Sequence, residues 1–231
     1  MSSSSSSSGT IAVVDAGVAS ETFLHFTPLV VGEWQQGERF ATRGEQSFYW
    51  RTVFSAEGRR SRLDEAAARG LSAEVVGERD YLLSCLKELL FESVRGSVDP
   101  SLPSRSECMF LFESTLDPLG YGTRLGRDAA DYTTLELRPV AGSRLFRARS
   151  ALLDVPASVP EIVAAAEEYW RGLAADAPAD DTEVLFTGRF EIIRVVSAGA
   201  GPRLTIEGKT FAELFGVRPA YPFAVNDRRT R

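Results

Sequence analysis

The sequence predicts one α+β domain, because short strand-like segments near both ends of the chain flank a middle region that holds amphipathic helices. With 231 residues, 44% of them hydrophobic, the chain is long enough for one sizeable core and too short for two large ones. We expect the domain to span residues 20–216, with a C-terminal tail over residues 217–231. Residues 1–19 predict a disordered leader, natural or left from cloning, because the serine run from Ser2 to Ser8 is too polar to bury.

The first part of the domain predicts extended segments and a short helix. A strand is expected over residues 20–31 and a short extended piece over residues 37–40. Residues 48–54 are dense in aromatic and β-branched side chains, so they fit either a strand or the aromatic face of a short helix. Residues 64–68 predict a brief helix that stops at Gly70.

The clearest helix is expected over residues 80–94, followed by Gly96 as a stop. Its apolar side chains recur at spacings of three and four residues and are Leu82, Leu83, Leu86, Leu89, Leu90 and Val94. Its polar face carries a stripe formed by Glu88, Glu92 and Arg95, one and two turns apart. This stripe fits either a solvated surface or a polar face aimed into a cleft.

A loop held by two prolines leads into a strand that is apolar throughout. Pro100 and Pro103 precede the run at residues 108–112, whose unbroken apolarity predicts a strand covered on both faces and central in a sheet. Because the prolines restrict the loop, Ser104 and Arg105 have little freedom to move, which suits ligand binding.

The C-terminal half adds strands and a second helix. Strands are expected over residues 132–137 and 143–148, and a helix with proline in its first turn over residues 159–173. Residues 182–193 predict a hairpin that turns at its Thr-Gly pair, and residues 203–215 predict a last strand and a short helix.

Composition limits the classes of function. The formal net charge of −6 argues against a protein that binds nucleic acid mainly by electrostatics, although Arg59, Arg60 and Arg62 form a local cluster. Cys85 and Cys108 are too few for a structural zinc site and are expected inside a helix and a strand. No apolar run approaches the roughly 20 residues that span a bilayer, so we expect a cytoplasmic protein.

Two polar residues stand out because they lie in apolar strands. Glu183 opens the predicted hairpin, and His25, the only histidine in the chain, lies within the apolar run at residues 23–26. If their strands are neighbours in one sheet, the two side chains can meet and form an active site. The simpler alternatives are a satisfied core histidine and a solvent-facing acid at a strand end.

These segments resemble the ADP-ribosyltransferase superfamily. The stretch Asp181-Thr182-Glu183-Val184-Leu185-Phe186, followed by Phe190-Glu191-Ile192-Ile193, is similar to its catalytic-glutamate hairpin. The run Phe23-Leu24-His25-Phe26-Thr27 is similar to the first strand of its histidine-containing branch. From about residue 22 to 196 the chain looks like an uncharacterised bacterial family of that superfamily, in which Glu92-Ser93-Val94-Arg95, Pro103-Ser104-Arg105 and Tyr169-Trp170 follow in the same order. The order is more specific than any single motif.

The resemblance implies a split, two-sheet fold that binds NAD in a cleft between the sheets. Glu183 would stabilise the oxocarbenium-like cation that forms as nicotinamide leaves the ribose. His25 would bond a hydroxyl of the adenosine ribose, with Thr27 beside it as a further contact to NAD. Ser104 and Arg105 would bind NAD as well, because a guanidinium forks onto the paired oxygens of a pyrophosphate.

The resemblance also implies an aromatic ring on which the nicotinamide stacks. The histidine branch uses a tyrosine in the strand that corresponds to residues 108–112, and that strand has no tyrosine here. Phe110 occupies the nearest position, and Tyr121 is a second candidate for stacking. Asp181 would match an extra acid that some members use to activate an acceptor.

The function implied is therefore an NAD-dependent ADP-ribosyltransferase that modifies a protein or a nucleic acid, in the manner of a toxin or a defence effector. An antitoxin or inhibitor would be a further partner. The alternatives are an NAD glycohydrolase, in which water replaces the acceptor, and a non-catalytic module of the same fold that binds a nucleotide or a partner protein.

Overall fold

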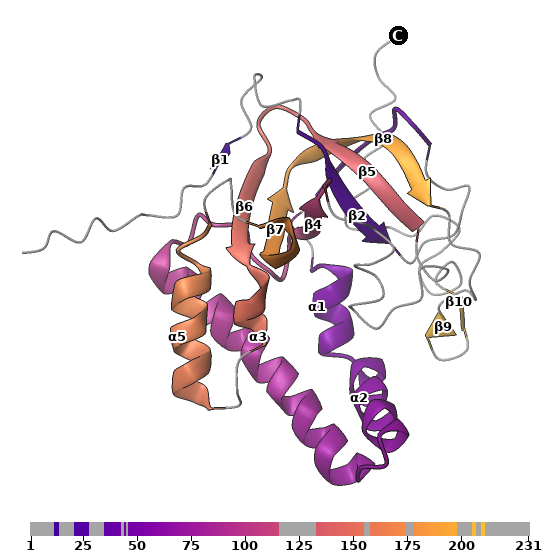
Figure 1. Cartoon of the computed structure of the whole chain (residues 1–231), viewed down its shortest axis with the longest axis vertical. Coiled ribbons are helices and arrows are strands. Elements are labelled where there is room, and N and C mark those ends of the chain that lie inside the picture. The colour runs from indigo at the N-terminus through magenta and orange to yellow at the C-terminus, as the bar shows by residue number, and fades with distance from the viewer. Residues whose placement is uncertain are drawn as a thin grey trace, which may run out of the picture.

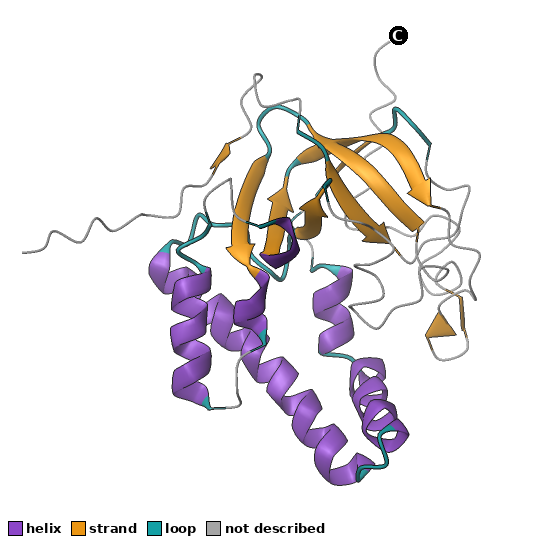
Figure 2. Ribbon diagram, viewed as in Figure 1, coloured by secondary structure: helices purple, strands orange, loops and turns teal. Residues whose placement is uncertain are grey.

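The computed structural model describes residues 12–13, 21–27, 35–42, 44, 46–115, 133–154, 158–173, 178–197, 205–206 and 209–210. The predicted α+β class is confirmed: a sheet forms the upper part of the molecule, and the helices gather below it (Figures 1 and 2). Tyr121, the tail at residues 217–231 and the short helix expected near residue 215 lie outside the described residues.

The described strands form an eight-stranded antiparallel sheet in the order β1-β6-β7-β4-β2-β5-β8-β3. They are β1 (Ala12–Val13), β2 (Phe23–Thr27), β3 (Arg39–Ala41), β4 (Met109–Glu113), β5 (Thr133–Pro139), β6 (Arg144–Arg149), β7 (Thr182–Thr187) and β8 (Arg189–Ser197). The short strands β9 (Thr205–Ile206) and β10 (Lys209–Thr210) pair with each other. The central position predicted for β4 is confirmed. Ala12 pairs with Leu145 on β6, so the expected leader is not disordered throughout.

The described helices are α1 (Phe48–Val53), α2 (Ala56–Ala68), α3 (Glu78–Val98) and α5 (Val159–Tyr169), with a π-helical turn over Ala73–Gly77 and 3-10 turns over Ser150–Leu153 and Ala179–Asp181. Of the two alternatives for residues 48–54, the helix is the one that forms. Its N-cap is Ser47, whose hydroxyl accepts a hydrogen bond from the backbone N–H of Trp50 at 3.1 Å. Ser55 caps α2 in the same way, so this helix begins well before residue 64.

Helix α3 is longer and less buried than its pattern predicts. It continues through Gly96 to Val98, because Gly96 does not adopt the positive φ with which a glycine ends a helix. Leu82 and Leu89 are 61% and 52% exposed and do not belong to the buried face. Helices α2 and α3 extend below the sheet in Figure 1.

The sheet consists of two halves, β1-β6-β7-β4 and β2-β5-β8-β3, which meet where β2 pairs with β4. That pairing is short: it joins Phe23 to Glu113 and Leu24 to Phe112. The pairing of β2 with β5 continues to Thr27. From His25 onward β2 therefore leaves β4, and we call this opening the β2–β4 split.

The segment predicted as a hairpin is a corner between the two halves. Strand β7 pairs with β6 and β4, whereas β8 pairs with β5 and β3, so β7 and β8 are not neighbours. The turn itself lies where it was predicted. Gly188 joins the strands with a φ of 129°, and a Cβ at this position would lie 2.5–2.7 Å from atoms of Ser143. Only glycine tolerates both conditions.

Apolar side chains pack in two layers. The first lies between the two halves of the sheet and contains Phe23, Met109, Leu111, Leu135, Leu137, Leu145, Val184, Phe186, Phe190 and Ile192. The second lies between the first half and helices α3 and α5, and includes Phe91, Leu102, Cys108, Phe146, Ile162, Tyr169, Trp170 and Leu185. Because side chains alternate along a strand, Glu183 shares the side of β7 that carries Leu185 and faces the helices.

Candidate active site

The loop between α3 and β4, residues 99–108, is held by the polar stripe of α3. The backbone N–H of Arg105 donates to Glu92 Oε1 at 2.5 Å, and the hydroxyl of Ser104 donates to Glu92 Oε2 at 2.9 Å. Arg95 donates to two carbonyl oxygens of the loop at 2.9 and 3.1 Å. The stripe is therefore not a solvated face: it packs against the loop that carries Arg105.

The guanidinium of Arg105 binds residues on two helices, α3 and α5, and on strand β7. Its Nε and Nη2 donate to the two carboxylate oxygens of Glu88 on α3 at 2.9 and 3.1 Å. Its Nη1 donates to Glu183 Oε2 on β7 at 2.5 Å and to the hydroxyl of Tyr169 on α5 at 2.7 Å. The Tyr169 hydroxyl in turn donates to Glu183 Oε2 at 2.5 Å. We call these four residues the Arg105 cluster.

The Arg105 cluster is buried and carries a net negative charge. Arg105 is 1% exposed and Glu88 6%. Burial disfavours the charged guanidinium, but Glu183, Tyr169 and Glu88 outweigh this effect and hold the pKa of Arg105 well above its usual value. Burial raises the pKa of Tyr169 well above its usual value; Arg105 opposes this and Glu183 adds to it. By formal charge, the two carboxylates of the cluster face one guanidinium, and one negative charge is left over.

We assign the negative charge that is left over to Glu183. Its side chain is 12% exposed. Both hydrogen bonds that hold it, from Arg105 and Tyr169, end on Oε2. Within the described part of the chain, Oε1 has no hydrogen-bond partner. The carboxylate is therefore fixed through one oxygen and presents the other.

His25 lies in the β2–β4 split. Its Nδ1 lies 3.0 Å from the carbonyl oxygen of Phe110, and because a carbonyl only accepts, Nδ1 carries the proton. Burial lowers the pKa of His25 to about 4, although the bond to Phe110 partly opposes this shift. The ring is neutral at pH 7, and its Nε2 is an acceptor that no described residue occupies.

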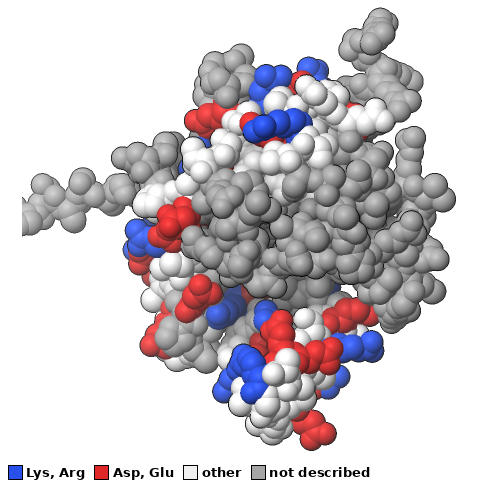
Figure 3. Space-filling model, turned by 45° about the vertical axis from the view of Figure 1, so that its right-hand side comes forward, with Lys and Arg blue, Asp and Glu red and all other residues white. Residues whose placement is uncertain are grey.

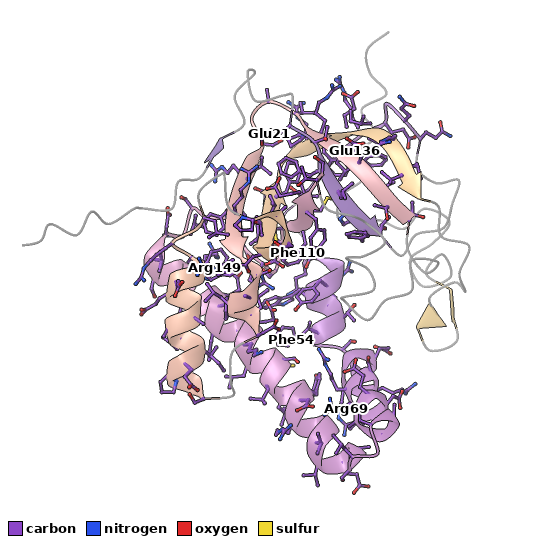
Figure 4. All side chains as sticks on the ribbon, viewed as in Figure 1. Glu21, Phe54, Arg69, Phe110, Glu136 and Arg149 are labelled. Atoms are coloured by element: carbon purple, nitrogen blue, oxygen red, sulfur yellow. The ribbon has the colours of Figure 1, made fainter. Side chains whose placement is uncertain are left out.

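Phe110 connects His25 to the Arg105 cluster. Its carbonyl binds His25, and its ring lies 5.0 Å from the Cζ atom of Arg105. Figure 4 labels Phe110 where the sheet meets the helices. The ring of Tyr49 on α1 lies 5.2 Å from that of Phe110 at an interplanar angle of 73°, and the Tyr49 hydroxyl donates to Glu88 Oε1 at 2.8 Å.

The structure therefore brings four of the predicted residues into one region: Glu183, Arg105, Phe110 and His25. Glu183 and His25 do not contact each other. Glu183 lies on the side of the sheet that faces the helices, and β4 separates its strand from that of His25.

Two residues that were predicted to contact NAD are bonded to side chains of the protein. Arg105 was expected to fork onto a pyrophosphate, but its guanidinium is buried and already bonded to Glu88, Glu183 and Tyr169. Ser104 was expected to bind NAD, but its hydroxyl is held by Glu92. Both residues act inside the protein, because the loop turns inward onto α3 instead of outward.

The other predicted residues lie elsewhere. Thr27 is buried at the end of β2. Asp181 accepts a hydrogen bond from the backbone N–H of Ala151 at 3.1 Å and pairs with Arg149 at 3.3 Å. Its carboxylate is therefore bonded to neighbouring residues just before β7 begins.

Sequence reasoning missed three residues of this region, all on helices: Tyr49, Glu88 and Tyr169. Glu88 was recognised in the polar stripe of α3, and the choice between solvent and a cleft depended on a loop that is distant in sequence. Tyr49 belongs to the aromatic run that was left open between strand and helix. Tyr169 was noted in the Tyr169-Trp170 pair of the resemblance, without a role in the site.

Other site classes receive no support from the part of the chain that is described. No group of three or more His, Cys, Asp or Glu side chains there is arranged to hold a metal ion. Cys85 is half-buried in α3, Cys108 is buried beside β4, and both are free thiols. None of the described helices combines the length and apolarity needed to cross a membrane.

Comparison with known proteins identifies a family for this chain. No curated protein matches the chain. A family model described as "Protein of unknown function (DUF2441)" matches residues 17–198, a range that contains every strand from β2 to β8 and the whole Arg105 cluster. Because the match covers more than half of the sequence, the chain belongs to this family, DUF2441.

Proposed function

We propose that this protein is an NAD-dependent ADP-ribosyltransferase with Glu183 as its catalytic carboxylate. The observation that carries the proposal is the state of Glu183: a carboxylate at the start of an apolar strand, held through one oxygen by Arg105 and Tyr169, with the other oxygen open.

The charge of the Arg105 cluster suits this chemistry. When the bond between nicotinamide and ribose breaks, positive charge develops on the ribose, as in glycoside cleavage. A fixed negative charge beside the ribose stabilises that transition state more than it stabilises bound NAD. Glu88 takes the bidentate fork of Arg105, so Arg105 does not neutralise Glu183 fully.

His25 supports the same proposal. Its Nε2 is a neutral acceptor, which suits a bond from a hydroxyl of the adenosine ribose. Glu183 acts at the other ribose of NAD, so direct contact between the two side chains is not required.

The arrangement of strands fits the split, two-sheet fold that the resemblance implies. The two halves of the sheet face each other across the first apolar layer, and they part at His25, the position at which NAD binding is expected.

The arginine cluster and the surface charge bear on which macromolecule accepts the ADP-ribose. Of the clustered arginines, Arg59 pairs with Glu78 and Arg62 with Glu65. In the view of Figure 3, acidic and basic side chains alternate over the lower, helical part of the described surface. A dedicated phosphate-binding strip is therefore not favoured, and a protein acceptor is the better proposal. An antitoxin or inhibitor remains a proposed partner.

The test is an assay with labelled NAD and a cell lysate, followed by nuclease or protease digestion of the product. Wild-type protein is expected to label a macromolecular fraction that protease removes. Glu183→Gln keeps an oxygen for Arg105 and Tyr169 but removes the charge, so we expect a loss of about 100-fold or more. Labelling that is equal in the variant and the wild type contradicts the mechanism.

The matched control is Glu191→Gln. Glu191 is a strand carboxylate on β8 that pairs with Arg39 and Arg138, outside the Arg105 cluster, and its substitution is expected to leave labelling unchanged. The same assay separates the alternatives. Release of nicotinamide without a labelled product indicates an NAD glycohydrolase. Calorimetric binding of NAD without turnover indicates the non-catalytic module, which the absence of a tyrosine from β4 favours.

A further inference from the structure

Helix α1 brings an aromatic ring next to the Arg105 cluster. The hydroxyl of Tyr49 is fixed by its bond to Glu88, and its ring is fixed by its contact with Phe110. The residue nevertheless keeps 38% of its surface exposed. Among the large hydrophobic residues that are exposed in the described part of the chain, it is the aromatic one. A ring that is held at two points and open to solvent is prepared for stacking, because little freedom is left to lose on binding.

Phe110 is less suitable for that role than its position in the strand implied. The guanidinium of Arg105 lies over its ring, 5.0 Å from the centroid, and the ring of Tyr49 packs against it. A flat ligand would have to displace a buried cation to use that face.

Tyr49 also lies close to the carboxylate that the reaction needs. Its hydroxyl donates to Glu88 Oε1, Glu88 accepts from the guanidinium of Arg105, and the same guanidinium donates to Glu183 Oε2. Two hydrogen-bonded residues, Glu88 and Arg105, connect the phenol to Glu183, so a base stacked on Tyr49 lies beside the Arg105 cluster, which contains Glu183.

Resting on the function proposed above, we propose that Tyr49 is the surface on which the nicotinamide ring of NAD stacks. In this chain the stacking residue then comes from helix α1, and β4, which lacks a tyrosine, contributes Phe110 as the support behind it.

The experiment compares the binding of NAD and of ADP-ribose, which lacks the nicotinamide, by calorimetry on the full-length protein. A Glu183→Gln background prevents turnover during the titration. Tyr49→Leu is expected to weaken NAD binding about 10-fold and to leave ADP-ribose binding within about twofold, since aromatic stacking contributes about this much. Tyr49→Phe keeps the ring and is expected to bind NAD within about threefold of the reference protein.

Tyr81→Leu is the matched control, because Tyr81 lies on the projecting part of α3, near Cys85 and Arg59, and is expected to change neither affinity. Unchanged NAD binding in Tyr49→Leu, or equal losses for NAD and ADP-ribose, overturns the role of Tyr49 and leaves the proposed function standing. A reference protein that binds neither ligand overturns both proposals.

Discussion

A neutral imidazole at pH 7 is the residue-scale property of His25 on which its proposed role depends. As the only histidine in the chain, it gives a single set of ring signals in a proton NMR titration. We expect an inflection at about pH 4 instead of near the usual value of 6.5. A ring that titrates near 6.5 contradicts the burial of His25 in the split.

The same shift predicts how stability depends on pH. Between pH 6.5 and about 4 the unfolded chain binds a proton that the folded His25 does not, so the free energy of unfolding falls as the pH falls through this window. The contribution is on the order of 3 kcal/mol at most. In urea unfolding, His25→Gln is expected to show a weaker pH dependence than the wild type.

At the scale of residues, the sequence predicted the residue types of the candidate site, but it did not predict the partners to which these residues bond. Glu183 and His25 were recognised because a charged or titratable residue in an apolar strand is unusual. The partners of Arg105 and Ser104 were not predicted, because Glu88 and Glu92 lie on a helix whose orientation no local pattern specifies.

At the scale of elements, the corner at Gly188 explains why β7 and β8 belong to different halves of the sheet. We predict that Gly188→Ala lowers the free energy of unfolding by about 2–5 kcal/mol, from backbone strain and from overlap with Ser143. Gly142→Ala is the control, because φ is 83° there but no heavy atom lies within 4 Å, and its cost is expected to be about 1–2 kcal/mol. Equal costs in urea unfolding contradict the close packing at the corner.

Helix α3 shows what the spacing of apolar residues can and cannot predict about a helix. Its existence followed from the spacing of its leucines, but Leu82 and Leu89 are exposed while Glu88 is buried. The periodicity of the apolar residues does not reveal which side of a helix meets the rest of the protein when that side is partly polar.

At the scale of the whole molecule, Arg105 ties together α3, α5, β7 and the loop before β4. Arg105→Met leaves Glu88 buried without its counter-charge, so we predict a loss of about 3–5 kcal/mol in the free energy of unfolding. Arg105→Lys is not expected to restore it, because an ammonium cannot bind both oxygens of Glu88 in the forked geometry.

The control for Arg105→Met is Arg62→Met. The pair Arg62–Glu65 is exposed, with side-chain exposures of 44% and 52%, and its loss is expected to cost less than about 1 kcal/mol. Denaturation curves that shift equally for the two variants would mean that the Arg105 cluster does not hold the molecule together.

By itself, the sequence determined the α+β class, most of the strands, the two main helices and the residue types of the candidate site, since these follow from local spacing and composition. The tertiary structure decided that β7 and β8 lie in different halves of the sheet, that His25 lies in the split and that Arg105 turns inward. These features depend on contacts between residues far apart in the chain, such as Arg105 with Glu183 and His25 with Phe110. Local patterns carry no information about such pairs.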